Sequence, residues 1–440
     1  MSQRDRSNKP ATGHKRFMKL AGMTASVAGN YAKTKLKTLF LDEASSSEAL
    51  ERLHDLNGGR IAETLGELKG AVMKVGQMAS IAKDVLPKEL ADALDSLHHE
   101  APPMAYSVIA EQITKELGAP PEQLFNWFAK EPFAAASIGQ VHRAATDDGR
   151  EVVVKVQYPG VDGAVDSDIK HLKLAFLASG LVKMDRKALD AVLGEIRARL
   201  NEELDYCNEA DNVRFFREAF GDDPRIIVPE VVGERSSQRV LTLTYEPGDS
   251  LSKLKDLGYS QSERDELGHA LVTLMLDQIF RLQTIHADPN PGNFAFRRDG
   301  RIVMYDYGCV KKLNTNMLDA YRFTIREAID ENYEAVEQGL RRLDVRNLKG
   351  PTFSPDYYKL WRDIFARPFL SETPFDFGRS TIHRDVLQHM PVFMTKYATA
   401  FQPSAEMVFL DRVIAGHYGN LCHLGCRGTF GSQLNAYVRP

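Results

Sequence analysis

Residues His286–Asn293 constrain this chain more than any other segment, because they read H-A-D-P-N-P-G-N and match the pattern H-x-D-x-x-x-x-N. A short hairpin separates them from Asp306-Tyr307-Gly308, a triplet of the D-F-G kind. Phosphoryl transfer on a kinase-type fold uses these groups in this order: one Asp orients or deprotonates the attacking hydroxyl, and an Asn and a second Asp hold magnesium. We therefore expect Asp288 to be the catalytic carboxylate, and Asn293 and Asp306 to hold Mg²⁺.

The composition excludes several other classes of protein. The chain has 440 residues, of which 43% are hydrophobic and 26% are charged, as in an ordinary soluble protein with two or more domains or lobes. The net charge of −4 gives no case for nucleic acid as a partner, and the four cysteines favour a reducing compartment. Because no apolar run reaches about 18 residues, we expect no transmembrane helix. These features predict a cytoplasmic protein, and a peripheral position on the inner membrane surface stays open.

The N-terminal segment is strongly basic. Asp5 is the only acid in residues 1–38, against nine basic residues: Arg4, Arg6, Lys9, Lys15, Arg16, Lys19, Lys33, Lys35 and Lys37. Apolar residues recur there at helical spacing: Phe17, Leu20, Met23, Val27 and Tyr31. Three interpretations fit this pattern: a basic amphipathic helix on an anionic membrane surface, a solvated tail, or an organellar transit segment.

The order of patterns along the chain predicts an α+β fold with two lobes. Residues 1–45 form the basic tail, and 46–125 read as a helical extension with an amphipathic stripe. Residues 126–245 read as a small β-rich lobe that also contains one long helix over 186–219. From 246 to 440 helices dominate, interrupted by the motif loop and its hairpin.

A lysine in an apolar strand is the next candidate site residue. Lys155 lies in the run V-V-V-K-V at 152–156, and a charge buried in a strand needs a partner. The alternative is an edge-strand lysine that faces solvent. On a kinase-type lobe such a lysine contacts the ATP phosphates and pairs with a glutamate on a helix. We assign Glu209 as that partner, with Asp205 on the same face of an unbroken helix and Glu203 on another. A solvated acidic helix face is the competing interpretation.

Two further segments bear on the nucleotide site. Where a kinase-type phosphate loop is rich in glycine, this chain has Ala134, Ala135, Ala136 and Ser137, which should make the loop stiffer. Thr244 and Tyr245 end a predicted strand, at the place expected for an adenine-binding hinge.

The helical extension contains the run K-V-G-Q at Lys74–Gln77. Lys74 and Gln77 share a helix face, and a glycine inside a helix suggests a close backbone approach. A polar face with an incidental glycine explains the same spacing.

Taken together, these motifs resemble those of the UbiB/AarF atypical kinases, which are associated with coenzyme Q biosynthesis. Lys74–Gln77 is similar to the KxGQ signature of that family, and Ala134–Ser137 to its alanine-rich loop. Glu203-Leu204-Asp205 resembles its ExD motif, with Glu209 as the glutamate that pairs with the lysine. Asn290 and Tyr307 stand where the family often has His and Phe, but neither change removes a charged catalytic group.

The resemblance implies a protein-kinase-like fold whose N-terminal extension covers the site, with Lys74, Gln77, Glu203 and Asp205 as gating residues. It implies ATP and Mg²⁺ as ligands, and ATP hydrolysis or small-molecule phosphorylation more than protein phosphorylation. A lipid or quinone-pathway molecule and an anionic membrane surface are the implied partners. An alternative stays open, in which ATP binding controls a regulatory or chaperone-like module of a membrane-associated biosynthetic complex and turnover is not essential.

Overall fold

The computed structural model describes residues 13–38, 52–53, 56–57, 60, 64, 103–135, 138–179, 186–402 and 405–439. The chain divides into two compact units, which are described separately. Unit 1 comprises Met1–Asp211 and Val231–Tyr245, and unit 2 comprises Asn212–Glu230 and Glu246–Pro440. One change of unit thus follows directly after Tyr245, at the end of the segment predicted to be a hinge.

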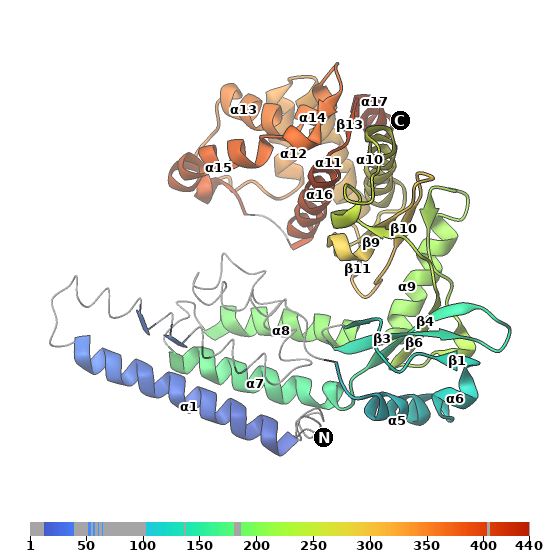
Figure 1. The fold of residues 1–440 in the computed structure, drawn as a ribbon. Helices are drawn as coiled ribbons and strands as arrows, with labels where there is room; N and C mark the ends of the chain where they lie inside the picture. Colours follow the sequence, from blue (N-terminus) through green and yellow to red (C-terminus); the bar gives the residue numbers. More distant parts are fainter. Residues whose placement is uncertain are drawn as a thin grey trace. The chain divides into compact units, whose positions relative to one another are not determined.

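Unit 1 contains a five-stranded antiparallel sheet (Figure 1). Its strands are β1 (Trp127–Phe128), β2 (Ala134–Ala135), β3 (Gly139–Ala145), β4 (Glu151–Gln157) and β6 (Val240–Thr244). The order is β1-β3-β4-β6, and β2 also pairs with β3. Along β4, Val152, Val154 and Val156 are buried because alternate side chains of a strand point to the same face. Gly149 turns the β3–β4 hairpin with a φ of +86°, which glycine adopts without strain.

Helices form the rest of the described part of unit 1. They are α1 (Gly13–Thr38), α5 (Tyr106–Leu117), α6 (Pro121–Leu124), α7 (Val161–Ser179), α8 (Arg186–Glu203) and the start of α9 (Tyr206–Ala219), with a short 3₁₀ turn at Gly233–Arg235. Scattered described positions between residues 52 and 64 are also helical.

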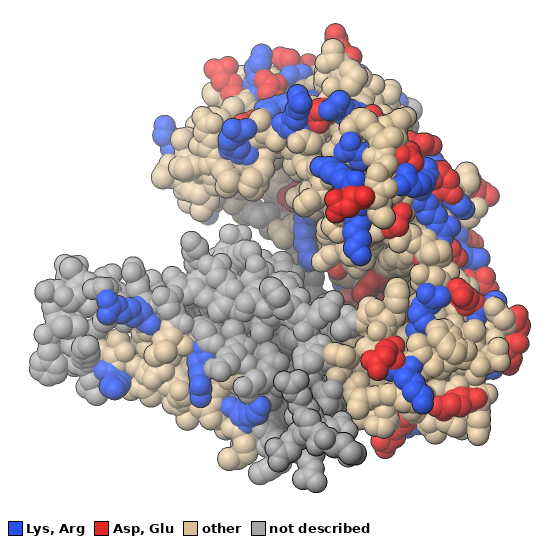
Figure 2. All heavy atoms as spheres, in the orientation of Figure 1, with Lys and Arg blue, Asp and Glu red and all other residues tan. Residues whose placement is uncertain are grey.

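The helix α1 packs against α7 (Figure 1). Met23 and Val27 of α1 are buried, and Asn57 donates from its side chain to the carbonyl of Val27 at 3.4 Å. At these two positions, the apolar stripe expected in the basic segment is therefore buried within the protein. Lys19 and Lys33 of the same helix are exposed, and Figure 2 shows basic side chains on the described surface of α1.

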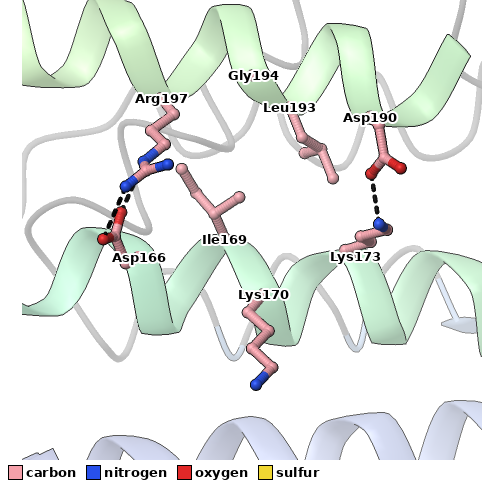
Figure 3. Close-up of a pocket in the computed structure, with 8 residues that line it drawn as sticks. All are labelled: Asp166, Ile169, Lys170, Lys173, Asp190, Leu193, Gly194 and Arg197. Atoms are coloured by element: carbon pink, nitrogen blue, oxygen red, sulfur yellow. Dashed lines mark hydrogen bonds and ion pairs between the residues drawn. The ribbon is translucent and has the colours of Figure 1, made fainter. Parts of the chain in front are cut away.

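Two ion pairs join α7 to α8 at either end of a shallow groove (Figure 3). Arg197 contacts Asp166 at 2.7 Å, and Lys173 contacts Asp190. Between the two pairs Leu193 of α8 lies over the buried side of α7. The two helices are thus held by apolar packing in the middle and by charge at both ends.

The prediction of a single helix over 186–219 is wrong, because the helix is interrupted between α8 and α9. The Asp205 carboxylate accepts the backbone N–H of Cys207 at 3.0 Å, as a helix-capping residue does, so a new helix starts there. The backbone also leaves the helical pattern at this point: Tyr206 donates its N–H to Gln238, and Leu204 accepts from the Gln157 amide. The face relation derived for an unbroken helix therefore does not hold for Glu203.

Two of the small sheets of unit 2 flank the predicted motif loop. The larger pairs β5 (Ile226–Ile227), β10 (Ile302–Met304), β9 (Phe294–Phe296) and β7 (Asp249–Ser250), in that order. The smaller pairs β8 (Thr284–His286) with β11 (Val310–Lys312) in an antiparallel arrangement. The predicted motif loop lies between β8 and β9, so both of its ends are anchored by strands.

Helices and short turns make up the rest of unit 2. The helices are α10 (Gln261–Leu276), α11 (Thr315–Ile329), α12 (Tyr333–Arg342), α13 (Pro355–Phe365), α14 (Arg367–Leu370), α15 (Ile382–Val392), α16 (Ala405–Leu424) and α17 (Gly431–Val438). A further strand pair, β12 (Phe375–Asp376) and β13 (Arg427–Gly428), is antiparallel. Short 3₁₀ turns cover Leu251–Lys253, Pro291–Asn293, Phe377–Arg379 and Ala398–Ala400, and π-helical turns cover Asp277–Arg281 and Phe393–Tyr397.

Local sequence explains how α10 begins and what it buries. Ser260 and Glu263 form a capping box, in which each side chain accepts a backbone N–H of the other residue. Leu267, Leu271 and Leu274 of α10 are buried. Among the helices of the described residues, none is long and apolar enough to cross a membrane.

Candidate active site

The predicted pair of Lys155 and Glu209 is present in unit 1. Lys155 on β4 donates from Nζ to both carboxylate oxygens of Glu209 on α9, at 2.9 and 2.8 Å. The two side chains are only 15% and 3% exposed, so the ion pair is largely shielded from water. The Lys155 ammonium also lies 5.1 Å from the ring centre of Tyr206, within the range of a cation–π contact. The break before α9 places Glu209 in the first turn of that helix, where a carboxylate is also favoured by the helix dipole.

The alanine-rich segment is described in part. Ala134 and Ala135 form β2 and pair with Val141 and Gln140 of β3, whereas Ala136 and Ser137 lie outside the described residues. Gly139, which follows the segment, has no room for a side chain, since an added Cβ would lie 2.4 Å from the backbone oxygen of Val156. The start of β3 therefore lies in close contact with the backbone of β4.

The predicted hinge residues end β6. Thr244 pairs with Val152, and Tyr245 donates its N–H to the carbonyl of Glu151. The Tyr245 ring stacks on the Arg143 guanidinium at 3.5 Å, which sets the orientation of the ring.

The four predicted gating residues are only half described. Lys74 and Gln77 lie outside the described residues. Glu203 ends α8 and Asp205 caps α9, so Asp205 has a structural task whether or not it also meets a ligand. A gating role for all four stays a prediction.

In unit 2, Asp288 and Asn293 of the predicted catalytic loop contact each other. The Asn293 amide donates to the Asp288 carboxylate at 2.9 Å and to its backbone oxygen at 3.1 Å. Asn290 closes the loop by accepting the N–H of Gly292 at 2.9 Å, so the amide that replaces the more usual His serves as a turn residue. The loop therefore presents the Asp288 carboxylate ahead of a 3₁₀ turn and the Asn293 amide at the end of that turn.

The buried His286 ties this loop to the Asp306 segment. Its Nε2 lies 3.0 and 2.7 Å from the backbone oxygens of Tyr305 and Asp306, and its backbone N–H donates to the Gln278 amide oxygen at 2.7 Å. Gln278 belongs to the π-helical turn that continues α10. Such turns are frequent at functional sites, because the extra residue redirects a side chain.

Asp306 adopts an uncommon backbone conformation. Its φ is +51°, which a residue other than glycine rarely adopts, and its Oδ1 accepts the N–H of Gly308 at 3.2 Å. The neighbouring Tyr307 is fully buried, its ring lies 5.5 Å from that of Phe216, and burial raises the pKa of its hydroxyl. Tyr307 is buried in the core, whereas the adjacent Asp306 is exposed.

The helix α16 supports the predicted catalytic loop through residues for which the sequence indicated no contact with that loop. Asn420 donates to the carbonyl of Pro289 at 3.0 Å, and Arg412 reaches the Asp288 carboxylate at 3.5 Å. The buried His417 ring lies 5.4 Å from that of Phe294, and burial lowers its pKa to about 3, with His286 adding to the effect. None of these contacts follows from a spacing, because α16 lies more than a hundred positions further along the chain than the loop.

The model of the ABC1 atypical kinase-like domain matches residues 96–340, more than half of the chain. The chain belongs to the ABC1 atypical kinase-like family. The matched range includes Lys155, Glu209, Asp288, Asn293 and Asp306. The predicted resemblance to the UbiB/AarF atypical kinases is confirmed, and so is the predicted α+β, protein-kinase-like fold.

Curated members of the ABC1 atypical kinase-like family are similar over much or all of the chain. The mitochondrial atypical kinase coq-8 of Caenorhabditis elegans is 29% identical over 100% of this chain and 59% of its own length. The chloroplastic protein ACTIVITY OF BC1 COMPLEX KINASE 8 of Arabidopsis thaliana is 34% identical over 63% of this chain and 38% of its own length. The chain thus spans between about two fifths and three fifths of these two relatives.

A solved structure is also similar to this member of the family. Rv3197 from Mycobacterium tuberculosis, solved as a complex with erythromycin, has a TM-score of 0.64 and 31% sequence identity. The similarity covers 90% of this chain and 98% of that one.

Proposed function

We propose that this chain is an Mg-ATP-dependent phosphotransferase or ATPase of the atypical kinase type. The observation that carries the proposal is the shielded ion pair of Lys155 and Glu209. In kinase-type folds this pair is formed in the competent state, because the lysine must be held where it meets the ATP phosphates. A solvent-facing lysine of β4 has no need of a glutamate that is only 3% exposed.

The proposed metal ligands have the right chemistry. Mg²⁺ prefers hard oxygen ligands and is bound in such sites by one or two carboxylates together with substrate phosphates. The Asn293 amide nitrogen donates to Asp288, so its amide oxygen is the end available to a cation, and the exposed Asp306 offers a carboxylate. Held by Asn293 and Asp306, the ion would supply positive charge that offsets the negative charge of the phosphates during transfer.

Asp288 then acts on the acceptor, which is water or the hydroxyl of a small molecule. The acceptor oxygen forms a bond to the γ-phosphorus, and the bond from that phosphorus to the β–γ bridging oxygen breaks. ADP leaves with the electron pair, and the Asp288 carboxylate orients the acceptor and takes its proton. The hydrogen bond from Asn293 holds the carboxylate in place for this task.

The acceptor class is proposed from the relatives. The C. elegans relative bears the name atypical kinase coq-8, and the family resemblance associates such proteins with coenzyme Q biosynthesis. We propose a phenolic or lipid-like acceptor of the quinone pathway, with Lys74, Gln77, Glu203 and Asp205 as gating residues. The exposed basic side chains of α1 support a peripheral position on an anionic membrane surface.

The substitution Asp288→Asn tests this proposal. It keeps the size of the side chain but removes the carboxylate, so ATP hydrolysis should be lost while nucleotide binding through Lys155 remains. A variant that binds ATP and also supports quinone synthesis in a deficient strain would favour a nucleotide-controlled binding module instead.

A further inference from the structure

The helix α16 reaches the catalytic loop of unit 2 with a cation. Arg412 Nη2 lies 3.5 Å from Asp288 Oδ1, while Asn293 contacts the other carboxylate oxygen. The helix is pressed against the loop at this point, since a Cβ added at Gly416 would lie 2.2 Å from the ring of Pro289. The position of Arg412 relative to Asp288 is thus set by packing as well as by charge.

The loop itself offers no positive charge. His286–Asn293 contains no Lys or Arg, and the position between His286 and Asp288 is the buried Ala287. In the transition state of phosphoryl transfer, negative charge is spread over the equatorial oxygens of the transferred group, and a cation near those oxygens lowers the barrier. In the described part of unit 2, Arg412 is the residue that brings a guanidinium to the catalytic carboxylate.

The ion pair of Arg412 and Asp288 is weak enough for Arg412 to leave Asp288 and bind another anion. Its distance of 3.5 Å is longer than the 2.9 Å of the Asn293 contact, and the two side chains are 34% and 37% exposed. An ion pair of this exposure is worth at most about 1 kcal/mol. A guanidinium can bind two phosphate oxygens at once in a bidentate arrangement, which makes a phosphoryl group a stronger partner than this single contact with Asp288.

We propose that Arg412 is a catalytic residue that binds the transferred phosphoryl group. In the resting protein it pairs with Asp288. During transfer it contacts the equatorial oxygens of the phosphoryl group, while the acceptor bond forms, the bond to ADP breaks and the acceptor proton passes to Asp288. Arg412 lies outside the residues matched by the family model, 96–340, so the family match does not assign it a role. This inference rests on the proposed ATP-dependent function.

The test compares Arg412→Gln, Arg412→Ala and Arg412→Lys in the full chain. Removing one transition-state cation should lower kcat for ATP hydrolysis on the order of 100-fold or more in the Gln and Ala variants, and less in the Lys variant. The KM for ATP should change by no more than about threefold, because the interaction is made in the transition state. Millimolar guanidinium chloride should restore part of the turnover of Arg412→Ala, which a purely structural role would not allow.

A second readout uses a transition-state mimic. Affinity for Mg-ADP with aluminium fluoride should fall in Arg412→Gln, whereas affinity for Mg-ADP alone should not, because only the mimic occupies the position of the transferred group. Arg427→Ala is the matched control. It removes an ion pair of unit 2, to Asp376 at 2.9 Å, that lies outside the loop, and it should leave both readouts unchanged.

Two outcomes would overturn the role of Arg412. One is wild-type kcat in Arg412→Gln, and the other is a loss of kcat that guanidinium does not restore and that comes with equal loss of Mg-ADP affinity. The Gln and Lys variants keep the stem of the arginine side chain through Cδ, so they decide the matter if the Ala variant does not fold. If the wild-type protein has no turnover that depends on Asp288, the proposed function fails instead, before the Arg412 variants are compared.

Discussion

The Lys155 ammonium donates to both carboxylate oxygens of Glu209, at 2.9 and 2.8 Å, in a pair that is only 15% and 3% exposed. This relationship joins a strand to a helix across 54 positions of sequence. A buried pair of this kind contributes little net stability but is costly to break, because the remaining charge has been removed from water.

Lys155→Met should therefore lower the free energy of unfolding by about 3–5 kcal/mol, since Glu209 stays buried without its ammonium partner. The double variant Lys155→Met, Glu209→Leu should recover much of that loss, yet neither variant should bind Mg-ATP with wild-type affinity. Urea unfolding and nucleotide titration measure the two effects. Lys173→Met breaks an exposed pair with Asp190 in the same unit and should change stability by less than about 1 kcal/mol. Equal losses in the Lys155 and Lys173 variants would contradict the account of the buried pair.

The buried His417 should make unit 2 sensitive to acid. Its pKa is about 3 in the folded protein, against an ordinary value near 6.5, so the unfolded chain takes up a proton first as the pH falls. The stability from the neutral ring is fully present above about pH 6.5 and is lost progressively between there and about pH 3. At pH 5 the loss amounts to about 2 kcal/mol relative to pH 7.

His417→Leu should remove this part of the pH dependence, measured as the difference in unfolding free energy between pH 7 and pH 5. His423→Leu, on the exposed side of the same helix, is the matched control and should leave the pH dependence unchanged. If His417→Leu loses as much stability at pH 5 as the wild-type protein, the neutral buried histidine is not the source of the acid sensitivity.

Reversal of the exposed charges of α1 tests the proposed membrane contact. Lys19→Glu with Lys33→Glu should weaken binding to anionic liposomes, by about 1 kcal/mol or more for each lysine near the surface, and should not affect the buried Met23 and Val27. Sedimentation with anionic vesicles measures the change, and zwitterionic vesicles are the control. Undiminished binding of the double variant to anionic vesicles would remove α1 from the proposed membrane surface.

Features that depend on residues close together in the sequence could be predicted, whereas features that depend on distant residues could not. The strand around Lys155 and the motif loop at 286–293 were predictable, because a run of β-branched residues and a short motif spacing encode them directly. The break at Asp205 was not, since it depends on hydrogen bonds between distant segments, from the Tyr206 N–H to the Gln238 carbonyl and from the Gln157 side-chain amide to the Leu204 carbonyl.

Two other features could not be predicted from the sequence, for a related reason. An amphipathic stripe looks the same whether it faces a membrane or a neighbouring helix, so the burial of Met23 and Val27 against the protein had no signature of its own. The contact between Arg412 and Asp288 spans 124 positions, and nothing in the composition of α16 marks that arginine. Long-range packing alone brings the two together.

The most direct test of the central claim is magnesium-dependent ATP hydrolysis by the full chain and by Asp288→Asn, with nucleotide binding measured in parallel. Anionic liposomes and a phenol that resembles a quinone precursor are added to each reaction in turn. The account predicts that ATP hydrolysis by the wild-type protein requires Mg²⁺. In Asp288→Asn the rate of hydrolysis should fall on the order of 100-fold or more, whereas the affinity for ATP should stay unchanged. Equal turnover in the two proteins, or ATP binding by the wild-type protein with no turnover under any of these conditions, would contradict it.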